Sequence, residues 1–303
     1  MDKVAFVFSG QGAQHPGMGE DFYQKNERAR ALFDAAEKIR PGITELCFHG
    51  DAAALKQTEN TQPCLYLADL AAALALKDAG VQPVALAGFS LGEIPALAFG
   101  GAFAFAEGFQ ITCKRGELMA EASAKQQTAM LAVLKMKNEA VEEICSRYEH
   151  VYPVNYNSPG QLVVSGLSQE LEQAKADFAA AGGKVVPLAV SGAFHSPFMD
   201  EAAGEFGEFL QMHQLKTPAI PVYSNYTAVP YGNQVAAGME KQINHPVQWE
   251  TIICAMCADG ITTFVETGVG NTLQKLIAKI APECRALRAE TMADVAAITE
   301  EVL

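Results

Sequence analysis

Apolar residues recur along the chain with two different periods. Short apolar runs at 3–8 and 84–87 predict buried strands, whereas 22–39 and 63–79 carry apolar residues at helical spacing. Further strands are expected near 221–224 and 262–266, and further helices near 106–122, 197–213, 234–243, 249–259 and 271–280. Strands that alternate with helices in this way predict an α/β layer with a mostly parallel sheet.

The middle of the chain has another order of elements. Strands are expected at 128–134, 151–157, 161–166 and 184–190, and helices at 138–148 and 168–182. The order strand–helix–strand–strand–helix–strand is that of the ferredoxin-like split unit. We therefore predict a ferredoxin-like small domain at 126–191, inserted into a large α/β domain that is made of residues 1–125 and 192–303.

A glycine-flanked serine lies between the predicted strand 84–87 and a small-residue helix at 91–99. Gly88-Phe-Ser-Leu-Gly92 is a G-x-S-x-G pentad. A strand before the pentad and a helix after it are the context of a nucleophile elbow, in which helix amides surround an exposed hydroxyl. Serine is also a favoured helix N-cap, and short motifs match by chance, so the pentad alone leaves Ser90 open between nucleophile and cap.

A serine nucleophile needs a base, and histidine is the usual one. Of the six histidines, we favour His195, which lies in a glycine-containing loop where the predicted small domain ends. The other five are His15, His49, His150, His213 and His245.

The loop after the first strand offers a second group of backbone amides. Gly10-Gln11-Gly12 follows the strand at 3–8 and is a candidate for half of an oxyanion hole. A dinucleotide-binding G-x-G-x-x-G motif would need glycine where this chain has His15, so we do not expect a Rossmann site.

Composition restricts the class of partner. Half of the 303 residues are hydrophobic, which allows a substantial core, and the formal net charge of −13 argues against nucleic-acid binding. An acidic protein partner would have to dock on a local basic patch. No signal peptide and no apolar stretch of the roughly 20 residues that span a bilayer are visible, so we expect a soluble cytoplasmic protein without a membrane partner.

The seven cysteines are scattered, which does not suggest a disulfide framework. Cys254 and Cys257 have the C-x-x-C spacing of redox and metal sites. They lie inside the predicted helix 249–259 without a second pair or a nearby histidine, so we predict a buried thiol pair and no metal site.

Six motifs occur in a characteristic order across nearly the whole chain. They are GQGAQ (10–14), GFSLGE (88–93), CKRGELM (113–119), NYNSPGQLVVSG (155–166), GAFHSPFM (192–199) and HPVQW (245–249). Together they resemble the malonyl-CoA:acyl carrier protein transacylase family of bacterial fatty-acid synthesis. The fold expected on this basis is α/β, with an α/β-hydrolase-like large domain and an inserted ferredoxin-like small domain.

The resemblance implies a role for each matching residue. Ser90 is the nucleophile and His195 the general base of a dyad, in which a backbone carbonyl steadies the histidine. The backbone amides of Gln11 and Leu91 form the oxyanion hole, and Arg115 binds the malonyl carboxylate. The implied partners are malonyl-CoA and acyl carrier protein, and the implied chemistry uses no cofactor and no metal.

Further substrate-binding residues follow from the same resemblance, with some departures from the family pattern. Gln248 matches a glutamine that lines the site near the serine and histidine, and Phe194 matches a form associated with malonyl preference. Phe89 replaces the usual histidine before the serine, and Ser9 replaces the usual proline. Phe89 removes a polar pocket wall and adds apolar bulk, which leaves a broadened acyl range as an alternative. The run GVGNTL (268–273) replaces the usual GPG.

Two other classes of function compete with acyl transfer. A serine thioesterase or esterase of α/β-hydrolase type shares G-x-S-x-G, and it predicts an HGGG-like run, which this chain lacks. A non-catalytic scaffold that binds acyl carrier protein would have no need to retain both Ser90 and His195.

Overall fold

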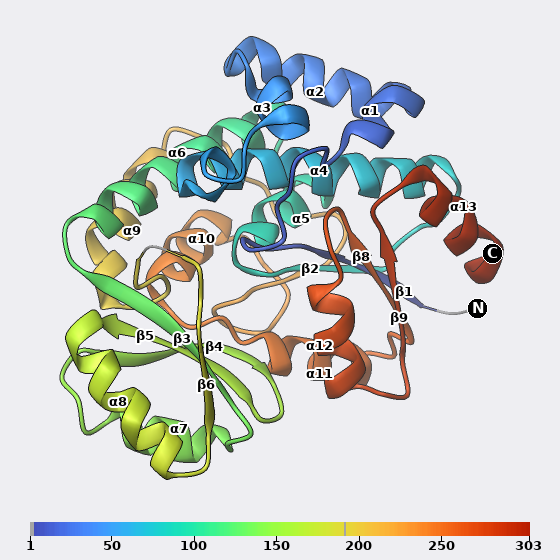
Figure 1. Cartoon of the computed structure of the whole chain (residues 1–303). Coiled ribbons are helices and arrows are strands. Elements are labelled where there is room, and N and C mark those ends of the chain that lie inside the picture. The colour runs from blue at the N-terminus through green and yellow to red at the C-terminus, as the bar shows by residue number, and fades with distance from the viewer. Residues whose placement is uncertain (1–2, 191) are drawn as a thin grey trace.

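Residues 3–190 and 192–303 are described by a computed structural model (Figure 1). Residues 1 and 2, and residue 191 at the predicted end of the small domain, lie outside the described residues. Within the described part of the chain, five parallel strands form sheet A in the order β7-β2-β1-β8-β9. These strands are β1 (Val4–Phe8), β2 (Ala85–Gly88), β7 (Val222–Tyr223), β8 (Thr263–Thr267) and β9 (Arg285–Ala289).

Side chains of β1 alternate between two cores, one on each face of sheet A. Phe6 and Phe8 belong to the larger core, whereas Ala5 and Val7 face a smaller core that contains α11 (Trp249–Ala258) and α12 (Thr272–Ile280). Because helices cover both faces, the central strands β1 and β2 are continuous apolar runs in the sequence. The helices of the larger core are α1 (Glu20–Lys25), α2 (Glu27–Ile39), α3 (Ile43–His49), α4 (Thr58–Asp78), α5 (Glu93–Phe99), α6 (Phe105–Ala124), α9 (Asp200–Leu210), α10 (Val235–Asn244) and α13 (Met292–Val302).

A second sheet, sheet B, occupies the middle of the chain (Figure 1). Its antiparallel strands lie in the order β4-β5-β3-β6, and α7 (Asn138–Cys145) and α8 (Ser168–Ala180) pack with it in a third core. The strands are β3 (Thr128–Leu134), β4 (Val151–Ser158), β5 (Gln161–Leu167) and β6 (Lys184–Pro187). Side chains of β3 again alternate, since Leu131 faces α7 and α8 while Met130 joins the larger core of sheet A.

Most helices and strands predicted from the apolar pattern are present in the structure, but some of their boundaries differ. The single helix predicted at 22–39 is two helices, because the Asn26 side chain accepts a hydrogen bond from Ala29 N at 2.8 Å and caps α2. The helix predicted at 197–213 begins with a 3₁₀ turn at Pro197–Met199 and ends at Leu210. Strand β6 ends at Pro187 instead of residue 190, so Leu188 and Val190 are free to line the pocket described below.

Three elements were missed by the pattern: α3, β9 and α13. The edge strand β9 carries Arg285 and Arg288, which interrupt its apolar run. Helix α13 has 11 residues, and the capping box of Thr291 and Asp294 was a local signal of its start. Among the described residues, no helix combines the length and the apolar character that crossing a membrane requires.

The turn after β2 presses against the end of β1. Phe89 N donates a hydrogen bond to Phe8 O at 3.0 Å, and a Cβ atom on Gly92 would lie 2.2 Å from the same oxygen. A Cβ atom on Gly88 would lie 1.9 Å from the backbone carbon of Gly92. Both glycines of the pentad are therefore required because the backbone passes too close for a side chain. This requirement adds to the one that the sharp turn itself makes.

We expect Gly92→Ala to lower the free energy of unfolding by about 3 kcal/mol, because its methyl group has no room beside two backbone oxygens. Urea unfolding monitored by circular dichroism measures the change. Gly204→Ala is the matched control, since Gly204 is an exposed residue of α9 with nothing near its Cβ position, and it should raise stability by roughly 0.5–1 kcal/mol. A Gly92→Ala protein as stable as the wild type would contradict the close approach.

Candidate active site

Ser90 lies at the carboxyl end of β2 with a positive φ of 52°, which is unusual for a residue that is not glycine. Asn225, which follows β7, holds the turn in place. Its Oδ1 accepts a hydrogen bond from Ser90 N at 2.7 Å, and its Nδ2 donates to Gly88 O at 2.6 Å. A single side chain thus fixes the backbone on both sides of Phe89 and aims the serine hydroxyl away from the sheet.

His195 is buried and lies within hydrogen-bond distance of the serine. Its Nε2 is 2.7 Å from Ser90 Oγ, and its Nδ1 is 2.8 Å from the backbone oxygen of Gln242. A carbonyl oxygen only accepts, so Nδ1 carries the proton and Nε2 has its lone pair toward the serine hydroxyl. His195 N also donates to Ile243 O at 3.1 Å, so the last turn of α10 positions both the backbone and the ring.

Burial keeps this histidine neutral. Desolvation, and after it the nearby positive charge of Arg115, lower the pKa of His195 to about 3. The ring is therefore able to accept a proton from Ser90 throughout the neutral pH range.

Arg115 projects from α6 into the same site and is buried. Its guanidinium donates to Gln62 Oε1 and Gln242 Oε1, each at 2.9 Å, and to Ser90 Oγ at 3.3 Å. Burial lowers the pKa of Arg115 to about 10, while the carboxylate of Glu93 acts in the opposite direction, so the group remains charged at neutral pH. The three hydrogen-bond acceptors are uncharged, which leaves this cation suited to a carboxylate ligand.

A small pocket of about 70 Å³ surrounds these groups. Met130 of β3 and Asn155 of β4 contribute to it, so it lies where sheet B meets the large core. The buried Oδ1 of Asn155 has no hydrogen-bond partner among the described residues. The lining residues are Gln11, Gln62, Phe89, Ser90, Arg115, Met119, Met130, Asn155, Leu188, Val190, Phe194 and His195.

The predicted oxyanion and acyl-binding residues also lie here. Gln11 lines the pocket because the loop after β1 packs on the elbow, where a Cβ atom on Gly10 would lie 2.7 Å from Phe89 O. Leu91 is buried and follows Ser90 in the first turn of the next helix. The half-buried Phe89 ring packs edge-on against Trp249, with 5.5 Å between ring centroids, and forms an apolar wall.

Comparison with known proteins agrees with this arrangement. The family model described as acyl transferase domain matches residues 5–297. The malonyl CoA-acyl carrier protein transacylase of Bacillus subtilis is 37% identical over 288 residues, which cover 92% of this chain and 91% of the relative. The chain belongs to this transacylase family.

Two further relatives show how far the similarity extends. A polyketide biosynthesis malonyl CoA-acyl carrier protein transacylase of Bacillus subtilis is 38% identical over 292 residues, covering 94% of this chain and 99% of the relative. The crystal structure of a malonyl CoA-acyl carrier protein transacylase from Clostridium perfringens superposes with a TM-score of 0.95 at 33% identity, covering 99% of this chain and 97% of the other.

Gln248, which the motifs predicted to lie beside Ser90 and His195, does not line the pocket in the described structure. Gln248 precedes α11, and its backbone N donates to Asn225 O at 3.0 Å, but it is not among the described residues that line the pocket. The glutamine beside the dyad is Gln242, whose carbonyl holds His195 and whose Nε2 donates to Ser90 O at 2.6 Å.

Sequence signals existed for the two polar residues that the motifs missed. Val235, Met239 and Ile243 form the buried face of α10, and Gln242 occupies a position on that face, where an apolar residue is expected. Asn225 follows β7, and the carboxyl ends of parallel strands are where ligand-binding side chains gather.

The cysteine prediction was also wrong in its pairing. Cys254 is exposed, and the sulfur next to Cys257 is that of Cys284, at 3.6 Å.

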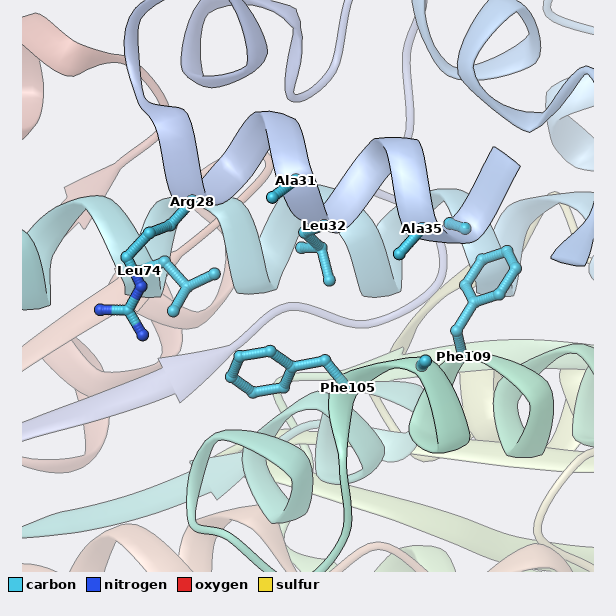
Figure 2. Close-up of a pocket in the computed structure, with 9 residues that line it drawn as sticks. Arg28, Ala31, Leu32, Ala35, Leu74, Phe105 and Phe109 are labelled. Atoms are coloured by element: carbon cyan, nitrogen blue, oxygen red, sulfur yellow. The ribbon is translucent and has the colours of Figure 1, made fainter. Parts of the chain in front are cut away.

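A larger cavity of about 260 Å³ lies between α2, α4 and α6 (Figure 2). Leu32, Leu74, Phe105 and Phe109 line it, and Arg28 lies at one end. It shares no lining residue with the pocket around Ser90 and has no convergent polar groups, so we do not assign it to the reaction.

We expect Gln242→Ala to slow acylation of Ser90 by on the order of 10²-fold, because it frees two hydrogen-bonding groups, on Ser90 and Arg115, inside a buried site. Gln248→Ala, the matched control, should stay within about threefold of wild type. Rapid-quench measurement of acyl-enzyme formation compares the two. A larger loss in Gln248→Ala than in Gln242→Ala would reverse the assignment.

Proposed function

We propose that this chain transfers the malonyl group of malonyl-CoA to the phosphopantetheine thiol of acyl carrier protein, through a malonyl ester on Ser90. The observation that carries the proposal is Arg115, a buried cation 3.3 Å from Ser90 Oγ with uncharged hydrogen-bond partners. A carboxylated acyl group on Ser90 would give this cation an anionic hydrogen-bond partner. The relatives' names, which include both fatty-acid-type and polyketide transacylases, support the same substrates.

The first half-reaction loads the enzyme. His195 Nε2 takes the proton of Ser90 as Oγ attacks the thioester carbonyl of malonyl-CoA, and negative charge develops on the carbonyl oxygen. We assign the stabilising donors to the backbone amides of Gln11 and Leu91, which approach the nucleophile from the loop after β1 and from the first turn after β2. Collapse of this intermediate releases the thiolate of coenzyme A, which receives the proton from His195.

The second half-reaction repeats these steps with another thiol. The thiol of acyl carrier protein passes its proton to His195 and attacks the malonyl-serine, and the serine leaves with that proton. The overall reaction exchanges one thioester for another of similar energy, so the two half-reactions together need no energy source, and the malonyl-serine between them makes the sequence ping-pong. No step calls for a metal or a cofactor.

The substrate itself makes His195 a stronger base. Arg115 is the second cause of the low pKa of His195, after burial. A malonyl carboxylate bound to Arg115 neutralises that charge and raises the pKa of the histidine in the complex. Binding of a carboxylated acyl group thus favours proton transfer, a benefit that a neutral acyl group does not bring.

Hydrolysis is supported less well by the geometry. The His195 ring is oriented by the Gln242 carbonyl, whereas the triad of an α/β-hydrolase esterase uses an Asp or Glu side chain at this position. Phe89 and Phe194 place apolar surface around the serine, which disfavours the entry of water. The small size of the pocket favours binding of a short acyl group.

We also propose the finer architecture on structural grounds. The strand–elbow–helix unit around Ser90 supports an α/β-hydrolase-like description of the large domain. The antiparallel order β4-β5-β3-β6 supports a ferredoxin-like insertion at 126–191. A cytoplasmic location stays a prediction.

The proposal is tested by intact-mass analysis after exposure to an equimolar mixture of malonyl-CoA and acetyl-CoA. We expect a single malonyl adduct on Ser90 in the wild-type protein and its transfer to acyl carrier protein on addition of the carrier. Arg115→Ala should lose on the order of 10²–10⁴ in malonyl kcat/KM, because roughly 3–5 kcal/mol is lost when a buried carboxylate has no partner. Its acetyl kcat/KM should change little, so the adduct becomes acetyl.

Two further variants separate charge from shape. Arg115→Lys keeps the positive charge without the two-pronged geometry and should retain intermediate malonyl selectivity. Ser90→Ala should give no adduct with either substrate. Equal losses for malonyl and acetyl transfer in Arg115→Ala would mean that Arg115 has only a structural role and does not bind the malonyl carboxylate. An adduct in Ser90→Ala would show that Ser90 is not the nucleophile.

A further inference from the structure

Two thiols and a carboxylate gather at the end of α11, apart from the residues of the transfer pocket. Cys257 lies in the last turn of α11, and Glu283 and Cys284 immediately precede β9. The sulfur atoms of Cys257 and Cys284 are 3.6 Å apart, and one carboxylate oxygen of Glu283 lies within 4.8 Å of both. Three metal-ligating groups from two segments of the chain therefore converge on one point.

The sulfur separation matches a shared metal ion. With Zn–S bonds of about 2.3 Å and tetrahedral angles, two thiolates on one zinc ion stand about 3.8 Å apart. The observed 3.6 Å is close to that value. A disulfide bond would require the two sulfurs to approach to about 2.05 Å, which is far from the arrangement present.

The fold positions the two cysteines before any ion binds. Cys257 and Cys284 are half-buried and pack against the core beneath sheet A. Cys284 N donates to Ala281 O at 3.0 Å, and the Cys284 thiol contacts Ile261 O at 3.7 Å. Helix α11 and the turn before β9 thus fix the backbone positions of both sulfurs, which lowers the cost of ordering the ligands.

Glu283 is exposed, and a third thiol lies close to these groups. Cys254 lies one helical turn before Cys257, on the same side of α11, and is exposed.

We propose that Cys257, Cys284 and Glu283 bind a thiophilic divalent cation of the Zn²⁺ class, with the fourth position filled by Cys254 or water. Two sulfurs and a carboxylate oxygen are ligands that zinc accepts, and each thiol gives up its proton when it coordinates. The ion would tie α11 to the turn before β9. It takes no part in the acyl transfer chemistry, whose residues line a different pocket.

The test uses the full chain, kept reduced by a phosphine and freed of metal, and titrated with Co²⁺ and then with Zn²⁺. We expect one Co²⁺ per chain, with sulfur-to-cobalt charge-transfer absorption that Zn²⁺ abolishes. Cys257→Ser and Cys284→Ser should each lower the affinity at least tenfold, and Glu283→Gln should lower it less. Cys113→Ser, which removes a half-buried thiol of α6, is the matched control and should bind as the wild type does.

A second measurement needs no substitution. Zn²⁺ should slow alkylation of Cys257 and Cys284 by iodoacetamide at least tenfold, read by peptide mass spectrometry, and leave alkylation of Cys113 unchanged. Absence of the charge-transfer band, a band that survives in both Cys257→Ser and Cys284→Ser, or equal alkylation with and without Zn²⁺ would each overturn the site.

Discussion

The hydrogen bond between His195 Nδ1 and the backbone oxygen of Gln242 is the interaction on which the candidate active site depends. It selects the ring tautomer whose Nε2 faces Ser90 Oγ. The acceptor is a backbone atom near the end of α10, so the base is positioned by a helix that packs in the large core. The side chain of Gln242 extends the same arrangement to Arg115 and to the Ser90 carbonyl. Gln242 therefore connects His195, Ser90 and Arg115, to which we assign the roles of base, nucleophile and substrate-binding cation.

A second constraint is the buried positive charge of Arg115. The charge is balanced at longer range by Glu93, which lies just after the elbow and accepts hydrogen bonds from Asn225 N and the Tyr231 hydroxyl. Burial raises the pKa of Glu93 to about 7, while those hydrogen bonds and Arg115 favour its charged form. The Glu93 carboxylate is thus held by hydrogen bonds from residues around the elbow and does not bind Arg115 directly. Gln62 and Gln242, which do accept hydrogen bonds from Arg115, are uncharged, so a substrate carboxylate can replace them.

Much of the architecture could be predicted from periodicity, because the central strands and the elements of sheet B carry strong local patterns. The apolar pattern did not predict the edge strand β9, because Arg285 and Arg288 interrupt its apolar residues. Ser90, His195 and Arg115, which the structure brings together, were predicted through motifs that surround each of them. Gln242 was not found, because a single polar residue on the buried face of a helix does not reveal its partner, here Ser90, 152 positions away.

The cysteines illustrate the same limit of local patterns. The C-x-x-C spacing drew attention to Cys254 and Cys257, yet the fold brings Cys284, from 27 positions further along, to Cys257. Phe89 is a different case, since the departure from the family pattern was visible in the sequence. Its packing against Trp249 required the structure, because the two rings come from β2's turn and from α11.

The central claim is that His195 is neutral and oriented in the free enzyme, and the pH dependence of malonyl kcat/KM tests it most directly. The measurement is made in Glu93→Gln, which removes a group whose pKa is raised to about 7. With the pKa of His195 lowered to about 3, the neutral base is fully populated at every pH in the range, so kcat/KM should stay level from about pH 8 down to about pH 5. Circular dichroism at each pH verifies that the variant remains folded. A fall in kcat/KM centred near the ordinary imidazole pKa of 6.5 would contradict the account.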